Sequence, residues 1–195
     1  MATGDETLYR LLRNVHILGF FSRSVLEEKY LRDVVGEGIS FTHLNVLKMV
    51  ALSGHHYLGD VAHFMDVSYA AASKLIDRME SRKLIKRVRY EGDRRAELLK
   101  LTPLGRSVIK KYDRHKIARL REQFGKVGET DARAMTESLE HLLEIFLKGR
   151  ELNPSSCLRC GAYASGSCLL LKSGAECPYR EHRISKRISN RALTV

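Results

Sequence analysis

The stretch Val67–Thr102, VSYAAASKLIDRMESRKLIKRVRYEGDRRAELLKLT, decides the fold because it joins a short amphipathic helix to a basic hairpin. Four apolar residues recur at helical spacing and place one stripe against a core: Ala72, Leu75, Ile76 and Met79. Ser68 precedes this stripe, and its hydroxyl can accept a hydrogen bond from an amide of the first turn. A helix followed by a basic hairpin predicts the reading part of a winged helix.

The second half of the stretch predicts two strands around a turn. LIKRVRY and AELLKLT contain β-branched and alternating residues, and EGDRR between them carries a Gly-Asp turn. Seven basic residues stand against two acidic ones between Arg82 and Arg95. A charge run alone is often only a solvated face, but this one adjoins a helix with small polar-face residues.

The wet face of the predicted helix suits a DNA groove. Small residues such as Ala70 and Ser73 let a helix backbone sit deep in the major groove, where hydroxyls and methyls reach base edges. Arginines at a hairpin tip suit the narrower minor groove, whose negative potential attracts them. Together these features favour double-stranded DNA as the partner.

Four short motifs in this region together resemble those of one protein family. They are the helix end Asp77-Arg78-Met79-Glu80, the pair Leu84-Ile85, the wing motif Asp93-Arg94-Arg95, and Leu101-Thr102-Pro103-Leu104-Gly105. In this order they resemble the MarR family of bacterial and archaeal transcriptional regulators, over about residues 5–150. Lys83 stands where that family usually has glycine, and lysine can adopt the left-handed conformation at modest cost.

The resemblance implies a homodimer that binds a pseudo-palindromic operator. It implies that Arg95 enters the minor groove, that Asp93 holds Arg95 in position, and that residues 68–74 face the major groove. The predicted DNA-contact set is Ser68, Tyr69, Ala70, Ser73, Lys74, Arg78, Arg89, Asp93, Arg94 and Arg95.

Composition and charge agree with such a partner. A formal net charge of +11 favours an anionic partner, either nucleic acid or a membrane surface, and 44% apolar residues suffice for a packed core. No apolar stretch approaches the roughly 20 residues of a membrane span, and the first residues lack the features of a signal peptide. We therefore expect a cytoplasmic protein without a membrane partner.

The expected fold is mainly α with a small β-hairpin wing, a winged helix-turn-helix carried by long dimerisation helices. The predicted parts are a dimerisation helix in 1–38, the winged helix in 39–102, two further dimerisation helices in 103–150 and a cysteine-rich tail in 151–195. The first helix should run to about Val34, and its broad apolar stripe favours a dimer contact over an internal core helix. Adjacent His55 and His56 lack a nearby third ligand, so both are expected at the surface.

All four cysteines lie in the tail, spaced C-x2-C-x7-C-x8-C: Cys157, Cys160, Cys168 and Cys177. In a reducing compartment such a cluster favours metal ligation over disulfides, with free or redox-switching thiols as the alternative. The second two cysteines do not form the close pair of a zinc ribbon. Single, uneven spacings and the final Cys177-Pro178 suit an iron-sulfur cluster, so [4Fe-4S] is favoured and zinc is the alternative.

The sequence thus predicts a homodimeric DNA-binding transcriptional regulator that senses redox state or a small molecule through a four-cysteine cluster. One alternative is a zinc-stabilised regulator that responds to a small-molecule effector. Another is a general transcription factor with a winged helix and a zinc module. An enzyme is not expected, because no acid-base pair, nucleophile constellation or phosphate-binding glycine loop is apparent.

Overall fold

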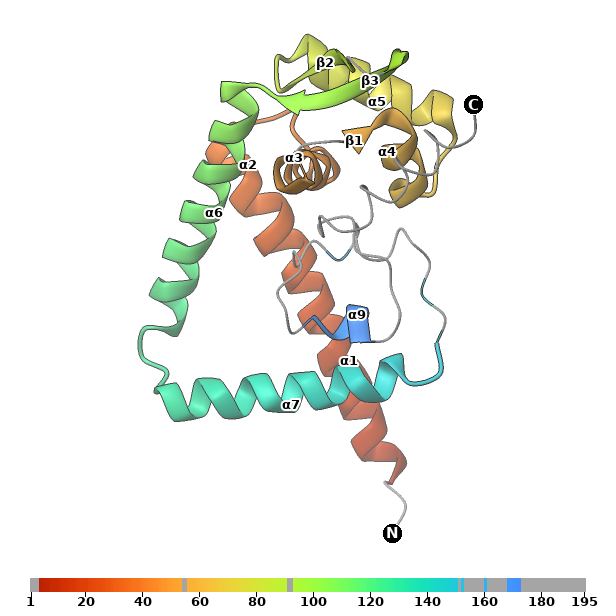
Figure 1. The fold of residues 1–195 in the computed structure, drawn as a ribbon. Coiled ribbons are helices and arrows are strands. Elements are labelled where there is room, and N and C mark those ends of the chain that lie inside the picture. The colour runs from red at the N-terminus through yellow and green to blue at the C-terminus, as the bar shows by residue number, and fades with distance from the viewer. Residues whose placement is uncertain are drawn as a thin grey trace.

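A computed structural model describes residues 4–53, 56–90, 93–150, 152, 160 and 168–172 of the chain. The architecture is mainly α-helical with one small antiparallel sheet, as predicted (Figure 1). A winged helix occupies one end. Two long helical segments extend from it, one before and one after the winged helix in sequence, and a third long helix crosses their far side to form an open base (Figure 1). None of the helices in this described part is long and apolar enough to cross a bilayer.

The first helical segment is continuous but changes its winding. It consists of α1 (Asp5–Phe21), the π-helical η1 (Ser22–Lys29) and α2 (Tyr30–Val35). The predicted long helix is therefore present, with a π-helical segment in its middle that the sequence analysis did not predict. The segment α1 buries no residue, whereas Tyr30 and Leu31 of α2 are buried, because α2 packs against α6. The predicted end is confirmed, because Gly36 (φ 68°) and Gly38 (φ 99°) stop the helix.

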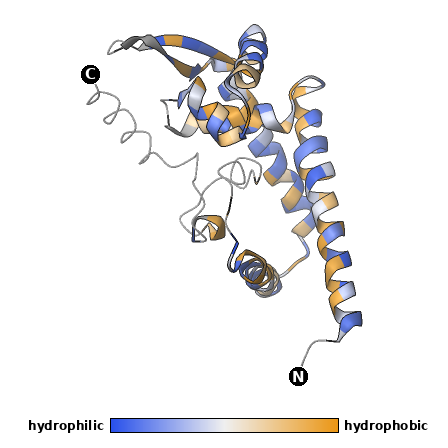
Figure 2. Cartoon of the chain, turned by 90° about the vertical axis from the view of Figure 1, so that its right-hand side faces the viewer, coloured by the Kyte–Doolittle hydropathy of each residue, from blue (hydrophilic) through white to orange (hydrophobic). Residues whose placement is uncertain are grey.

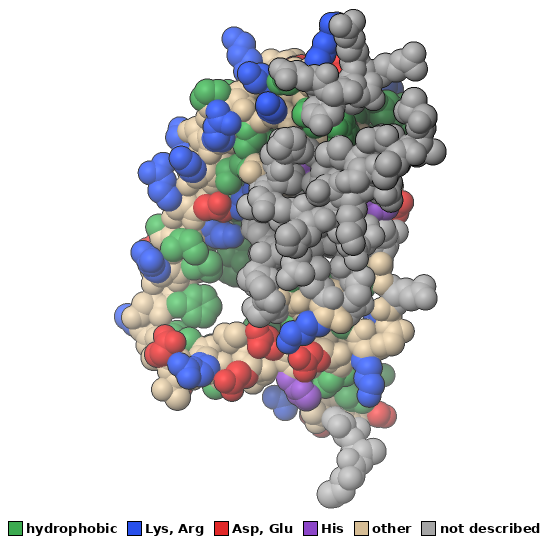
Figure 3. Space-filling model, viewed as in Figure 1, with side chains coloured by type: hydrophobic (Ala, Val, Ile, Leu, Met, Phe, Trp, Pro, Cys, Tyr) green, Lys and Arg blue, Asp and Glu red, His purple; other side chains and the backbone are tan. Residues whose placement is uncertain are grey.

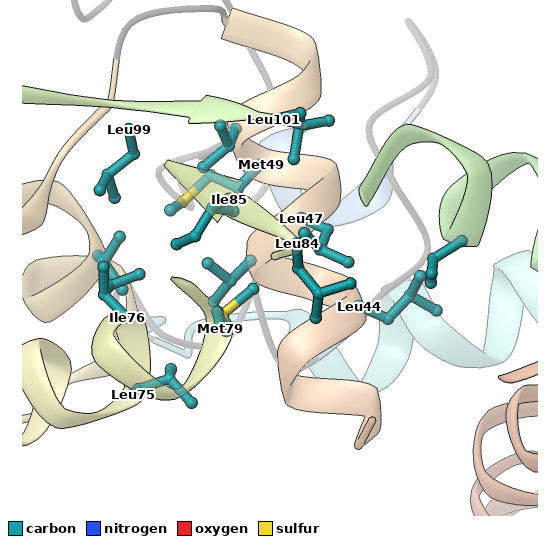
Figure 4. Close-up of a cluster of buried hydrophobic side chains, with 14 of the residues drawn as sticks. Leu44, Leu47, Met49, Leu75, Ile76, Met79, Leu84, Ile85, Leu99 and Leu101 are labelled. Atoms are coloured by element: carbon teal, nitrogen blue, oxygen red, sulfur yellow. The ribbon is translucent and has the colours of Figure 1, made fainter. Parts of the chain in front are cut away.

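The winged-helix core forms between three helices and the sheet. The helices are α3 (Phe41–Ser53), α4 (Leu58–Met65) and α5 (Tyr69–Ser81). Figure 4 shows their side chains meeting those of the strands in one cluster, which includes Leu44, Leu47, Met49, Leu75, Ile76, Met79, Leu84, Ile85, Leu99 and Leu101. Each fully buried side chain of this size contributes about 1.5–3 kcal/mol, so this cluster fixes how α5 sits on the domain.

The sheet has three strands in the order β1-β3-β2. They are β1 (His56–Tyr57), β2 (Ile85–Tyr90) and β3 (Asp93–Leu101). The prediction that His56 lies at the surface was wrong: its side chain is 0% exposed, because β1 pairs with β3 at His56↔Leu99 and so draws this residue into the sheet. His55 lies outside the described residues.

The junction after the wing is closely packed. Thr102 caps α6 (Pro103–Phe124) as predicted, since its hydroxyl oxygen accepts from the Gly105 amide at 3.1 Å. The same hydroxyl donates to the Lys83 carbonyl at 2.5 Å. A Cβ at Gly105 would lie 2.1 Å from the Leu84 carbonyl oxygen, so only glycine permits this approach. Lys83 adopts the left-handed conformation (φ 56°), in agreement with its position before the wing.

The open base is lined by apolar side chains. Helix α7 (Glu129–Leu147), like α1, buries no residue within the chain. With α1 and α6 it frames an open triangle in Figure 1, and Figure 2 shows hydrophobic residues along α1 and α7. A groove of about 1020 Å³ lies in this region, lined by Leu18, Ile117, Leu120, Arg121, Phe124, Ala132, Ala134, Met135, Thr136, Ser138 and Leu139. A single chain leaves this surface exposed.

A buried lysine joins the winged helix to α6. Lys48 of α3 donates to Asp113 Oδ1 at 2.5 Å, and its ammonium lies 5.1 Å from the centroid of the Tyr112 ring. Burial lowers the pKa of Lys48 to about 8, although the hydrogen bond to Asp113 acts in the opposite direction. Burial also raises the pKa of Tyr112, whose hydroxyl donates to the Leu26 carbonyl at 2.8 Å.

We expect the free energy of unfolding of the wild-type protein to rise with pH in the alkaline range, and Lys48→Met should remove this rise. Because the pKa of Lys48 is about 8 in the folded chain against 10.5 ordinarily, the native state loses this proton first. The free energy of unfolding should therefore rise between pH 8 and about 10, by at most about 1.4 kcal/mol per pH unit. Urea unfolding at several pH values measures this rise. The control Lys29→Met, which removes an exposed pair with Asp33, should keep it; a rise that persists in Lys48→Met would contradict the assignment.

Candidate nucleic-acid interface

Helix α5 presents the face that the sequence predicted. Ser68 caps it, since its hydroxyl oxygen accepts from the Ala71 amide at 3.2 Å. The predicted apolar stripe, Ala72, Leu75, Ile76 and Met79, is buried. Ser68, Tyr69, Ala70, Lys74 and Arg78 are exposed, Tyr69 most visibly at 64%, while Ser73 is half-buried. The first turns of α5 therefore offer hydroxyl, methyl and ammonium groups to a partner, as a helix in a major groove does.

The wing begins its second strand earlier than predicted. β3 starts at Asp93, so Asp93, Arg94 and Arg95 belong to a strand and not to the turn. The pairing is irregular between Arg89 and Tyr90, and Tyr90 pairs with Asp93. Arg89 is exposed. The side chains of 93–95 lie outside the described residues, so their predicted roles at DNA stay predictions.

Arg87 fixes the wing to α5. This β2 residue donates from Nη1 to Glu80 Oε2 at 2.7 Å and from Nη2 to Asp77 Oδ1 at 2.5 Å. Its backbone amide donates to Glu80 Oε1 at 3.0 Å, and its Nε lies 3.5 Å from Glu97 Oε2 on β3. One guanidinium therefore connects three carboxylates on the helix and both long strands, in the paired geometry that arginine favours.

Sequence reasoning missed this role and counted Arg87 only as part of the basic run. The signal was present in Asp77 and Glu80, which lie three residues apart on one side of the helix. A charge that binds neighbouring carboxylates is not available to phosphate, so the net basicity of the wing is lower than the residue count indicated.

The far end of α5 contacts the start of α3. A Cβ at Gly38 would lie 2.2 Å from Arg82 Nη1, which shows how closely this guanidinium covers the glycine. Ser40 Oγ and His43 Nδ1 lie 2.7 Å apart at the start of α3. Burial, Arg82 and Arg78 together lower the pKa of His43. This end of α5 is thus held by the domain, which leaves its first turns for recognition.

The cysteine segment is described only in part. Cys160 is exposed and Cys168 is half-buried, whereas Cys157 and Cys177 lie outside the described residues. Cys168 precedes the short α9 (Leu169–Lys172), which contacts α7. Within the described ranges no three His, Cys, Asp or Glu side chains come together as metal ligands. The predicted four-cysteine site therefore stays a prediction.

Known proteins share the overall fold of this chain. Residues 37–96 match the sequence model of the MarR family. YusO from Bacillus subtilis has the same fold, with a TM-score of 0.61 and 19% identity over 73% of this chain and 99% of that chain. The chain has the fold of the MarR family. A MarR family protein from Bacillus stearothermophilus matches with a TM-score of 0.59 and 18% identity over 75% of this chain and 100% of its own.

A third similar structure contains DNA. FabT from Streptococcus pneumoniae, in complex with DNA, matches with a TM-score of 0.50 and 20% identity over 73% of this chain and 94% of that chain. No curated protein matches the sequence significantly. Because 73% of this chain covers almost all of YusO, the remainder of this chain has no counterpart in that structure.

Arg87→Met should loosen the attachment of α5 to the wing. It removes the pairs with Asp77 and Glu80, whose side chains are partly exposed, so we expect a loss of about 1–2 kcal/mol in the free energy of unfolding. Urea unfolding measures this loss. Arg87→Lys keeps the charge without the planar fork and should give an intermediate value; equal stability of all three proteins would show that the junction does not depend on Arg87.

Proposed function

We propose that this protein is a homodimeric, sequence-specific DNA-binding transcriptional regulator of the MarR type. One observation carries the proposal: the exposed first turns of α5 stand beside a basic wing, in an orientation fixed by Arg87. MarR family members are transcriptional regulators and not enzymes, so the resemblance adds no support for an enzyme.

The proposed contacts divide between two grooves. Residues 68–74 of α5 would lie in the major groove, where Tyr69, Ser73 and Lys74 reach base edges or phosphates. Arg95, held by Asp93, would enter the adjacent minor groove from the wing. Arg78, Arg89 and Arg94 would contact phosphates along the same path.

The proposed dimer rests on the apolar surfaces of α1 and α7. Several of their large apolar side chains are exposed in one chain: Leu8, Leu12, Ile17, Leu18, Phe20, Met135, Leu139, Leu143 and Ile145. Soluble proteins rarely expose so much contiguous apolar surface without a partner. A second copy related by a two-fold axis would cover it and would set two reading helices about 34 Å apart, as a pseudo-palindromic operator requires.

Arg95→Ala should weaken binding to the operator by about 1–3 kcal/mol, roughly five- to 150-fold, if Arg95 reads the minor groove. Duplexes selected from a random pool with the wild-type protein supply the operator, and fluorescence anisotropy measures affinity. Lys126→Ala, which removes one exposed charge at the far end of α6, is the matched control and should bind like wild type. If Arg95→Ala binds the operator as tightly as Lys126→Ala does, the wing does not contribute to operator binding.

Selection also tests the class of function. A wild-type dimer that enriches one pseudo-palindrome supports the regulator. Binding without sequence preference, together with capture of RNA polymerase, would instead support the general transcription factor.

For the tail we propose that Cys157, Cys160, Cys168 and Cys177 bind one metal centre, with [4Fe-4S] favoured and zinc as the alternative. The spacing of the four cysteines supports this, as does the contact of α9 with α7, which brings Cys168 close to a helix of the proposed dimer. A bound cluster would supply a group whose charge changes with redox state. The cysteine segment would then act on DNA affinity through α7, with a coupling of about 1–3 kcal/mol.

Metal content and the visible spectrum of protein purified without oxygen test the tail. Brown protein with iron and sulfide that bleaches in air supports the cluster, and colourless protein with one zinc supports the zinc-stabilised regulator, which would respond to a small-molecule effector instead. A variant with all four cysteines changed to serine should lose the metal. If this variant keeps both operator affinity and redox response, the sensor role is wrong.

A further inference from the structure

The base of the wing and the adjoining face of α6 carry a second basic surface. It consists of two wing residues and three helix residues, which we call the wing–α6 patch: Lys86, Lys100, Arg106, Lys110 and Arg114. All five are exposed. Figure 3 shows Lys and Arg side chains gathered over this end of the molecule and down the outer edge along α6. None of these residues belongs to the predicted DNA-contact set.

The patch brings like charges together on neighbouring elements. Lys86 and Lys100 are direct cross-strand partners in the β2–β3 ladder, where like charges oppose pairing. Arg106 Nη1 donates to the Leu101 carbonyl at 3.0 Å, which holds its guanidinium at the end of β3 beside Lys100. The surface therefore passes without a break from the wing to the helix.

The part of the patch on α6 also places like charges next to one another. Arg106, Lys110 and Arg114 are spaced four residues apart, so they lie on one face of α6, opposite the buried Val108 and Tyr112. Like charges at this spacing oppose helix formation. In the part of the chain that the structure describes, the hydrogen bonds of these five side chains are those of Arg106 to the Leu101 carbonyl and of Arg114 to the Lys110 carbonyl.

Acidic neighbours do not compensate this charge. Some other exposed basic residues of the described chain have carboxylate partners, such as Arg119 with Glu122 at 2.6 Å and Lys29 with Asp33 at 3.3 Å. Within the same described ranges, no ion pair involves a member of the wing–α6 patch. An external anion is therefore the partner that its charge fits.

We infer that the wing–α6 patch binds the phosphate backbone of DNA that flanks the operator. This inference rests on the proposed DNA-binding function. The patch continues from the wing, and from Arg106 to Arg114 it extends about 12 Å along α6. With a phosphate every 3.4 Å or so along one strand, this length spans about three phosphate steps. Because α6 leads away from the wing (Figure 1), the flanking duplex must bend toward the side of the regulator.

The test removes two charges from the patch. Lys100→Gln with Lys110→Gln keeps the aliphatic stems and breaks no hydrogen bond or ion pair recorded for these two exposed side chains, so folding should be unchanged. The control Lys126→Gln with Lys148→Gln removes the same charge from exposed positions at the ends of α6 and α7, in the base. Affinity is measured from 50 to 200 mM salt on the selected operator, with and without about ten flanking base pairs on each side.

With flanked DNA, the patch variant should show a salt slope smaller by about 2 per protomer, since each phosphate contact contributes about 0.9. Wild type and control should share the steeper slope, and on trimmed DNA all three proteins should agree. Lys86→Gln with Arg114→Gln should reproduce the effect. Equal slopes for wild type and both patch variants on flanked DNA would overturn the inference, whereas a wild-type protein that selects no duplex would overturn the proposed function itself.

Discussion

The recognition surface depends on one guanidinium. Arg87 connects Asp77 and Glu80 of α5 with the two long strands, so the helix and the wing cannot change their relative orientation without separating charged hydrogen-bond partners. Thr102 and Gly105 extend this constraint to α6 through the carbonyls of residues 83 and 84. The proposed binding to two DNA grooves at once would need this rigidity, because both contacts would fail if the angle between them changed.

Local patterns predicted most of the fold. The caps at Ser68 and Thr102 and the buried stripe of α5 depend on residues within one or two helical turns, and the structure confirms them. The features that the sequence analysis predicted wrongly or missed depend on contacts between residues that are distant in sequence. The two-residue strand at His56 exists only because β3 pairs with it, about 40 residues later. The partners of Arg87 lie on other elements, so the sequence analysis counted this residue only as part of the basic run.

The Lys48–Asp113 pair, which joins the winged helix to the base, combines a favourable charge interaction with an unfavourable burial of charge. Lys48 gains from Asp113 and from the face of Tyr112, yet burial of its ammonium costs enough to lower its pKa to about 8. Such a pair holds α3 against α6 by geometry more than by net stability, because the cost of burying the Lys48 ammonium offsets much of its attraction to the half-exposed Asp113 carboxylate. The joint is specific in orientation but contributes little stability of its own.

The most informative features are those that cost free energy in a single chain. Several apolar side chains of α1 and α7 are exposed in the described part of the chain, and the wing–α6 patch places like charges on paired strands and successive helical turns. Each would be unfavourable for an isolated protomer, and each matches a different partner: a second copy for the apolar surface and a polyanion for the basic one. The cysteine segment differs, because α9 already contacts α7 within the chain. If the cysteines hold a metal centre, its state would therefore act first on the helix that the second copy is proposed to cover, and only through that helix on the spacing of the two reading heads.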